Sequence, residues 1–309
     1  MSASRPLART AAALGLVALV GGAVALAAPA RADAAPVRPV RPVDDDTLAG
    51  RSGKLRARFL LPSPDGMFAY LRRLLGDSVS ARSGVYTARA DGTRRPFTYI
   101  ALLPFAEKVD GRIGRYRIGF SPGERGRGAA RGGDKYAPPA GFIQVTRENA
   151  ATPVSEHFRL RDFLTHDQAR VWPKYLVLDE ALVDKLELVI SDLRARGYRA
   201  DRLHVMSGFR TPQYNRGGGD TRGRAELSRH QYGDAADVWV ENGDGTMADL
   251  DGDGRVDAGD AAVLAESAER VERAHPELTG GVGIYRATRA HGPFVHIDVR
   301  GHRARWGAG

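Results

Sequence analysis

The sequence contains no cysteine. This absence excludes a disulfide framework, a thiolate metal site, a cysteine nucleophile and lipid attachment at a cysteine. Any metal must therefore be bound through nitrogen and oxygen atoms. With 309 residues, of which 42% are hydrophobic, the chain is long enough to bury at least one sizeable core in one or two domains.

Acidic residues are absent from the first 32 positions, where Arg5 and Arg9 precede an uncharged run over residues 10–30. A basic start, an apolar run and small residues after it are typical of a secretory signal peptide, here residues 1–32. A membrane anchor is the alternative interpretation, because the run is about 20 residues long. Cleavage is favoured by the Ala-x-Ala steps at Ala28, Ala30 and Ala32.

The mature chain is basic. Removing residues 1–32, which carry three arginines and no acid, lowers the formal net charge from +9 to +6. A positive field of this kind suits an anionic polymer, either nucleic acid or cell wall. Export favours the wall, so we expect a secreted or periplasmic protein that associates with the wall, binds no nucleic acid and keeps no membrane anchor after cleavage.

The first half of the mature chain offers no catalytic constellation. Residues 33–53 are rich in proline, valine and charge, which predicts a disordered linker. Residues 54–152 contain short β-type runs, such as 97–103 and 115–120, and a loop over 123–133 that is rich in glycine and arginine. We therefore expect a β-rich domain whose role the sequence does not reveal.

Residues 153–309 have the pattern of an α+β domain, with a small antiparallel sheet and flanking helices. Asp179 is a predicted N-cap, an apolar stripe at helical spacing follows over residues 182–193, and Gly197 is a predicted stop. Three β-type runs come after this helix, at residues 203–206, 235–240 and 294–299.

A set of potential metal ligands lies on these strands and the loop before them. His230 precedes Asp237 by seven residues, and His296 lies in the last β-type run. Two histidines and one carboxylate meet the usual ligand count of a catalytic zinc site that keeps one position for water. Strand alternation places His296 and Asp298 on one face. Taken singly, such residues are more often hydrogen-bonded structural groups than ligands.

The segment around these residues resembles a known family. Ser228, His230, Gly233, Ala235 and Asp237 match the Ser-x-His-x-x-Gly-x-Ala-x-Asp signature of the zinc D-alanyl-D-alanine carboxypeptidases and dipeptidases, the hedgehog-like murein peptidases. The resemblance covers roughly residues 158–306 and includes the stretches Ser207-Gly208-Phe209-Arg210, Gly281-Val282-Gly283-Ile284-Tyr285 and Val295-His296-Ile297-Asp298.

This resemblance implies a catalytic Zn²⁺ bound by His230, Asp237 and His296, and a peptidoglycan peptide as substrate. It also implies that Arg210 holds or polarises the substrate, a role that suits the fixed donor fork of a guanidinium. A surface arginine that stabilises a turn is the alternative interpretation of Arg210.

The general base of the family is missing here. Many members carry a glutamate three residues before the last histidine, or a histidine two residues before it, and these positions are Pro293 and Phe294. Asp298 is the natural substitute, because it shares a strand face with His296. His291, on the loop before that strand, is the other candidate, either as the base or as a donor to the transition state. If neither serves, the domain binds zinc without hydrolysing a peptide.

Residues 249–260 have the spacing of an EF-hand loop inserted in the zinc domain. Acids occupy loop positions one, three, five, nine and twelve, glycine is sixth, and position seven would offer its backbone carbonyl. We expect structural Ca²⁺ rather than a sensor; a solvated acidic turn is the alternative. The predicted calcium residues are Asp249, Asp251, Asp253, Arg255 and Asp260.

These observations favour an exported zinc metallopeptidase that cuts peptidoglycan stem or cross-link peptides with a zinc-activated water. Two other functions stay open: a non-catalytic, zinc-containing wall-binding module, and a calcium-dependent adhesion protein.

Overall fold

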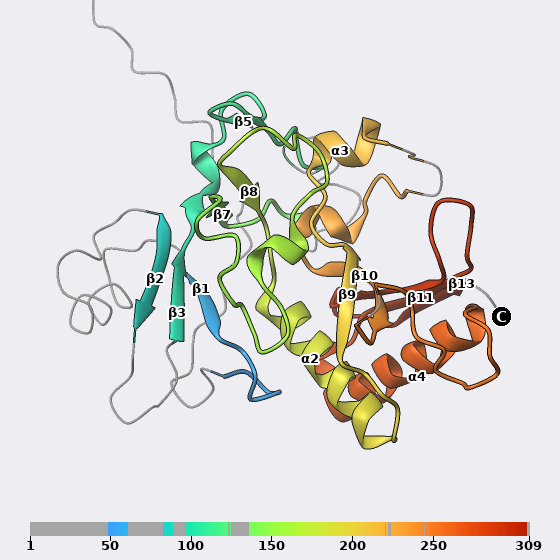
Figure 1. The fold of residues 1–309 in the computed structure, drawn as a ribbon. Helices are drawn as coiled ribbons and strands as arrows, with labels where there is room; N and C mark the ends of the chain where they lie inside the picture. The colour runs from blue at the N-terminus through green and yellow to red at the C-terminus, as the bar shows by residue number, and fades with distance from the viewer. Residues whose placement is uncertain are drawn as a thin grey trace, which may run out of the picture. The chain divides into compact units, whose positions relative to one another are not determined.

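The computed structural model describes residues 49–60, 83–88, 97–122, 124, 136–219, 221, 224–243 and 245–307. The predicted signal peptide, most of the linker and most of the loop over residues 123–133 lie outside these residues. The described residues fall in one compact unit of α+β structure (Figure 1). Among the residues that the structure describes, no helix has both the length and the apolar character needed to cross a membrane.

The first part of the described chain forms small sheets. One sheet has the order β1-β3-β2, with β1 parallel and β2 antiparallel to β3. A second has the order β4-β7-β8, and β5 and β6 form a two-stranded pair. The strand bounds are β1 Ala57–Leu60, β2 Gly84–Ala88, β3 Phe97–Ala101, β4 Leu103–Pro104, β5 Arg112–Ile113, β6 Tyr116–Arg117, β7 Gly141–Val145 and β8 Lys174–Leu176.

A strand pair, an ion pair and a hydrogen bond join the two predicted domains across their predicted boundary at residue 152. Strand β7 pairs antiparallel with β8, which lies beyond that boundary. Arg58 in β1 forms an ion pair with Glu180, and the backbone N–H of Phe59 donates to the same carboxylate. One hydrophobic core also runs through both parts of the chain. The described β-rich segment is thus packed against the segment that carries the predicted metal ligands.

Helix α2, Glu180–Ala195, begins and ends where the sequence predicts. The Asp179 side chain accepts a hydrogen bond from the backbone N–H of Ala181 at 2.9 Å, which satisfies a donor at the helix start. Gly197 adopts a φ of 87° just after the helix. The apolar stripe is core, as predicted, and its buried members are Leu182, Val183, Leu186, Val189, Ile190 and Leu193.

A five-stranded sheet carries the predicted metal ligands. Its strand order is β13-β11-β12-β10-β9, and its pairs are antiparallel except for β11 with β13, which are parallel. The predicted small antiparallel sheet is therefore mixed at one edge. The strands are β9 Arg202–Ser207, β10 Ala235–Glu241, β11 Gly281–Tyr285, β12 Phe294–Asp298 and β13 Ala304–Gly307.

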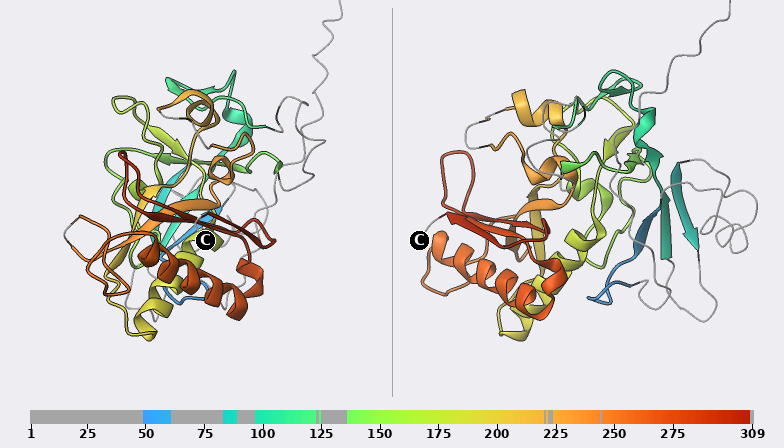
Figure 2. Two further views of the ribbon diagram at one scale, coloured as in Figure 1. Left: turned by 90° about the vertical axis from the view of Figure 1, so that its right-hand side faces the viewer. Right: turned by 180° about the vertical axis from the view of Figure 1, so that it is seen from behind.

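One face of this sheet is covered by α2 and by helix α4, Ala258–Ala274, as the views in Figures 1 and 2 agree. Val238, Val295 and Ile297 are fully buried among the core residues. Because side chains alternate along a strand, Asp237 and His296 project from the other face. Shorter elements connect the strands: η2 Phe105–Glu107, η5 Leu160–Phe163, α3 Pro212–Gly217, η6 Arg229–Tyr232 and η7 Pro276–Leu278.

Helix α2 also buries charge, which its apolar stripe does not predict. The Lys185 ammonium is fully buried and donates to the Glu272 carboxylate of α4 at 2.6 Å and to the Asp298 carbonyl at 2.8 Å. Removing one partner of such a pair leaves an uncompensated buried charge and costs about 3–5 kcal/mol. Lys185 therefore ties α2 to both α4 and the end of β12.

Candidate metal centre

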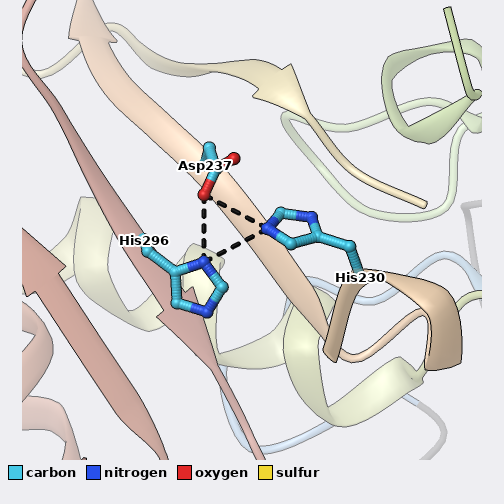
Figure 3. A group of neighbouring side chains, drawn as sticks. All are labelled: His230, Asp237 and His296. Atoms are coloured by element: carbon cyan, nitrogen blue, oxygen red, sulfur yellow. Dashed lines mark hydrogen bonds and ion pairs between the residues drawn. The ribbon is translucent and has the colours of Figure 1, made fainter. Parts of the chain in front are cut away.

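Three elements bring His230, Asp237 and His296 together. His230 lies on the short helix η6, Asp237 in β10 and His296 in β12, and Asp237 is paired directly with His296 in the sheet register. Figure 3 shows the three side chains pointing toward one another from these elements. All three are buried. The sequence-predicted ligands thus form one cluster that could hold a metal ion.

The positions of the ligand atoms fit a tetrahedral ion. The Oδ1 atom of Asp237 lies 3.2 Å from Nε2 of His230 and 3.0 Å from Nδ1 of His296. The two histidine nitrogens lie 3.2 Å apart. Ligands placed at zinc–nitrogen distances of about 2.0–2.1 Å in tetrahedral geometry are separated by about 3.3 Å. The donor set and its spacing therefore suit zinc, with one position left for water or substrate.

Hydrogen bonds outside the cluster fix both imidazoles. His230 places Nδ1 2.7 Å from the carbonyl oxygen of Gly208, so Nδ1–H donates there and Nε2 keeps its lone pair for the cluster. His296 places Nε2 3.0 Å from Oδ2 of Asp298, which leaves Nδ1 for the cluster. The two histidines therefore use different ring nitrogens as potential ligands.

The charges of the cluster are coupled. Burial lowers the pKa of His230, and burial opposes ionisation of Asp237. The charges and hydrogen bonds of His230 and His296 outweigh that effect and hold the pKa of Asp237 well below its ordinary value. Burial also disfavours protonation of His296, but its bonds to Asp237 and Asp298 raise its pKa. Asp237 is thus the anion that a cation would meet here.

The loop that carries His230 is held rigidly. Gly233 ends η6 with a φ of 70°, and a Cβ atom at this position would lie 2.3 Å from the carbonyl oxygen of Val177. Only glycine fits there. The Arg229 guanidinium forms a buried ion pair with Asp234, including a bond from Nε to Oδ1 of 3.1 Å. The sequence predicted a tight turn at Gly233 but not the Arg229–Asp234 ion pair, since a single Arg and Asp five residues apart give no distinctive signal.

Asp298 lies behind His296 rather than beside the ligand atoms. Its carboxylate accepts hydrogen bonds from the backbone N–H of Gly281 at 2.7 Å, from the N–H of Arg300 at 3.0 Å, and from the Arg300 guanidinium. These donors and His296 outweigh burial and hold the pKa of Asp298 far below its ordinary value. Asp298 and His296 lie on the same face of β12, as the alternation of side chains along the strand predicts. However, Asp298 contacts Nε2 of His296, the ring nitrogen that points away from the cluster.

His291 lies on the segment before β12. Its Nδ1 is 2.8 Å from the carbonyl oxygen of Gly292, and its ring packs edge-on against Phe294 with centroids 5.0 Å apart. The side chain is partly exposed. His291 is thus not among the residues that the structure gathers around the three ligand atoms, although it packs on the strand that carries His296.

Arg210 contacts the cluster directly. Its Nη2 donates to Oδ2 of Asp237 at 2.5 Å, and its Nε donates to the Ser207 hydroxyl at 2.9 Å. The Asp237 carboxylate therefore uses Oδ1 toward the two histidines and Oδ2 toward Arg210. This contact argues against the interpretation of Arg210 as a turn-stabilising surface residue, because the guanidinium orients a potential ligand.

A polar cavity of about 200 Å³ opens next to Arg210. We call it the arginine pocket and define it by the described residues that line it, which are His166, Met206, Ser207, Phe209, Arg210, Tyr214 and Arg224. Because Arg210 contacts both this cavity and Asp237, the pocket adjoins the triad. Of these residues, Ser207, Phe209 and Arg210 belong to the stretch that carries the family resemblance.

Trp306 is a further neighbour that sequence reasoning missed. Its ring centroid lies 5.1 Å from that of His296, and its Nε1–H donates to the Tyr285 hydroxyl at 2.8 Å. It crosses β11 over Gly283, where a Cβ atom would lie 2.3 Å from the indole. Parallel pairing of β13 with β11 produces this contact, and a pairing so distant in sequence leaves no local pattern.

The predicted calcium residues are brought together only in part. Ligand oxygens of Asp249, Asp251 and Asp253 lie within 4.8 Å of one another, and all three residues are exposed. Asp260 instead accepts backbone N–H bonds from Leu250 at 2.5 Å and Asp257 at 2.8 Å and caps the start of α4. Arg255 is exposed, and its N–H donates to Asp253.

Comparison with known proteins gives one match. Residues 177–251 match the family model described as Peptidase M15. This stretch contains Arg210, His230 and Asp237, and it ends before His296. No curated protein and no solved structure matches the chain. The C-terminal half of the chain therefore contains a domain of the Peptidase M15 family, the zinc D-Ala-D-Ala carboxypeptidase family.

Proposed function

We propose that the protein is an exported zinc metallopeptidase that hydrolyses a D-alanine-containing stem or cross-link peptide of peptidoglycan. The observation that carries this proposal is the buried triad, whose three ligand atoms lie 3.0–3.2 Å apart and whose first two members fall in the M15 domain. When bound there, zinc would supply a Lewis acid and lower the pKa of a coordinated water.

The residues around the triad have distinct proposed roles. Arg210 orients Asp237 and presents its guanidinium to the arginine pocket, where it would hold the substrate. Asp298 orients His296 through Nε2, as outer carboxylates do for histidine ligands of metals. Its five N–H donors leave it poorly suited to accept a further proton, so His291 stays the other candidate for the general base although it lies outside the ligand cluster.

The cellular setting stays a proposal drawn from the sequence. The basic start, apolar run and Ala-x-Ala steps of residues 1–32 support export, and the +6 charge of the remaining chain supports association with an anionic wall polymer. The described chain is rich in exposed arginines, such as Arg115, Arg159 and Arg286.

Digestion of purified peptidoglycan tests the function. The zinc-loaded mature protein is incubated with murein, and soluble products are identified by mass. We expect release of D-alanine or of shortened stem peptides, and no release after chelation of zinc. The Asp237→Asn variant serves as the matched inactive control. A zinc-loaded, folded wild-type protein that binds murein without cleaving it would favour the non-catalytic wall-binding module instead.

Calcium binding at residues 249–260 is a second proposal, supported by the grouping of Asp249, Asp251 and Asp253. A backbone hydrogen bond from Asp253 lowers the pKa of Asp251, but the neighbouring charges of Asp253, Asp260 and Asp249 contribute to a net rise. This mutual repulsion is the reason to expect a cation. The neighbouring helix α4 packs on the sheet, so the loop should stabilise that helix.

We expect calcium at about 100 times its dissociation constant to raise the melting temperature of the wild type by about 5 °C or more. The Asp251→Ala, Asp253→Ala double variant should lose this increase and keep its zinc. Thermal unfolding with and without a calcium chelator measures the difference. Glu148→Ala with Glu226→Ala removes the same charge elsewhere and should keep the increase. Equal melting temperatures for the wild type in both conditions would remove the calcium proposal.

A further inference from the structure

Three side chains next to His296 form a cluster of their own, which we call the histidine clamp: Asp298, Arg300 and Trp306. Asp298 ends β12, Arg300 follows two residues later, and Trp306 lies in β13 at the edge of the five-stranded sheet (Figure 1). All three lie beyond residues 177–251, the stretch that matches the Peptidase M15 model. The clamp is separate from the three potential ligand residues, so its contacts describe what holds one of them in place.

Arg300 holds the Asp298 carboxylate in one orientation. Its backbone N–H donates to Oδ1 at 3.0 Å, its Nε lies 2.9 Å from Oδ1 and 2.8 Å from Oδ2, and its Nη2 also donates to Oδ2. The Asp298 side chain is fully buried, and charged hydrogen bonds in such surroundings are strong. Oδ2 is thereby kept 3.0 Å from Nε2 of His296.

The orientation of Asp298 decides which ring nitrogen of His296 is available to a metal. With Nε2–H donating to Oδ2 of Asp298, the lone pair of Nδ1 faces the ligand cluster, 3.0 Å from Oδ1 of Asp237. A ring that flips about its Cβ–Cγ bond, or that carries its proton on Nδ1, loses this arrangement. Arg300 therefore acts on His296 through Asp298.

Trp306 contacts both His296 and Arg300. Its ring centroid lies 5.1 Å from that of His296, with 48° between the ring planes. The guanidinium carbon of Arg300 lies 5.3 Å from the Trp306 ring centroid, within reach of a cation–π contact. The indole is itself anchored, because its Nε1–H donates to the Tyr285 hydroxyl at 2.8 Å. A rotation of the His296 ring would therefore have to displace an anchored indole.

Strand β11 leaves room for the clamp by having glycine at two positions. A Cβ atom at Gly281 would lie 2.4 Å from Oδ2 of Asp298, 2.8 Å from the Trp306 ring and 2.9 Å from Nη2 of Arg300. A Cβ atom at Gly283 would lie 2.3 Å from the indole. Any larger residue at either position would have to displace the clamp. The backbone of β11 is thus in close contact with all three members of the clamp.

We propose that Arg300 and Trp306 are positioning residues that hold His296 with Nδ1 toward the metal position, so that strand β13 is part of the metal centre. Arg300 acts through Asp298, and Trp306 acts on the imidazole ring itself. The inference rests on the zinc-binding part of the proposed function and does not depend on the substrate. It gives residues beyond the matched family stretch a role in holding the ion.

The zinc affinity of the mature protein, measured by competition with a chromophoric chelator, tests the role of Arg300. We expect Arg300→Gln to weaken zinc binding by about 10-fold or more, the scale of losing a group that orients a metal ligand. Arg300→Lys should recover only part of the affinity, because an ammonium keeps the charge but not the paired donors. Adding Arg300→Gln to Asp298→Asn should cause little further loss, since both changes act on the same contact.

The same assay tests Trp306. Trp306→Leu should weaken zinc binding by about 10-fold, and Trp306→Phe should recover most of the affinity, because it keeps an aromatic ring on His296. Arg303→Gln is the matched control, since Arg303 is exposed in the same segment and pairs with Glu269 at 3.3 Å. It should keep the wild-type affinity. Far-UV circular dichroism shows whether each variant is folded.

Proton NMR of the zinc-loaded protein gives a second readout, which a general loss of stability would not produce. The ring Nε2–H of His296 is buried and donates to Asp298, so it should give a slowly exchanging signal in the wild type. At saturating zinc this proton should exchange faster in Arg300→Gln and keep its wild-type rate in Arg303→Gln.

The outcomes separate the clamp from the enzyme. Wild-type zinc affinity in folded Arg300→Gln or folded Trp306→Leu would overturn the positioning role of that residue, even if the protein cleaves murein. Losses from Arg300→Gln and Asp298→Asn that add in full would overturn action through Asp298. Weakened zinc binding in both variants, with no hydrolysis of murein by the zinc-loaded wild type, would support the clamp and overturn the peptidase proposal. A wild type that binds no zinc overturns both.

Discussion

Replacement of His296 with alanine should abolish both zinc retention and peptide hydrolysis. His296 supplies one of three potential ligand atoms, and its Nδ1 lies 3.0 Å from Asp237 and 3.2 Å from His230. A site reduced to two protein ligands falls below the count of a catalytic zinc centre. Elemental analysis after gel filtration and a murein digest measure the two effects. His230→Ala and Asp237→Ala should behave in the same way.

The control for this experiment is His275→Ala. His275 lies just after α4, is partly exposed, and pairs only loosely with Glu277 at 3.7 Å. The variant should keep about one zinc per chain and its activity. Because His296 also packs on Trp306, circular dichroism must show that the His296→Ala protein is folded. A full zinc complement in folded His296→Ala would contradict the ligand assignment.

Replacement of Asp298 with asparagine should weaken zinc affinity by about 10–100-fold, the usual effect of removing a group that orients a metal ligand. The asparagine keeps the shape of the side chain but removes the charge that fixes Nε2–H of His296 and pairs with Arg300. Saturating zinc should then restore most of the turnover. Competition with a chromophoric chelator measures the affinity, and rates are taken at saturating zinc.

His291→Ala is the complementary variant. If His291 is the proton acceptor, its loss should reduce turnover at saturating zinc by about 100-fold or more and leave zinc affinity unchanged. The opposite pattern, in which Asp298→Asn keeps its zinc affinity and loses turnover, would return the role of base to Asp298. If neither variant changes hydrolysis at saturating zinc, the proton acceptor is another group.

The sequence predicted those features of the metal site that depend on neighbouring residues in one short segment. The His230-to-Asp237 spacing, together with Gly233, predicted a tight turn that leads into a strand, and alternation placed Asp237 and His296 on the face opposite Val238 and Ile297. These are local relations of period two, so the sequence alone contains them. The observed helices and strands confirm the predicted α+β class. The Peptidase M15 match over residues 177–251 confirms the family resemblance.

Relations between distant segments were not predictable in this way. Alternation gave the face of Asp298 but not the ring nitrogen of His296 that it contacts, which depends on the side-chain rotamer. Arg224 lies on a loop that brings it into the arginine pocket beside the triad. Trp306 lies next to His296 because β13 pairs with β11. The pairing of β7 with β8 likewise joins segments that composition had separated.

The X-ray absorption spectrum of the zinc-loaded protein tests the central claim most directly, because it reports the ligands of the metal itself. We expect one zinc in four-coordinate geometry, with two imidazole nitrogens at about 2.0–2.1 Å and oxygen completing the shell. An oxygen-only shell, which would place the ion at Asp249, Asp251 and Asp253, or a folded protein that retains no zinc, would contradict it.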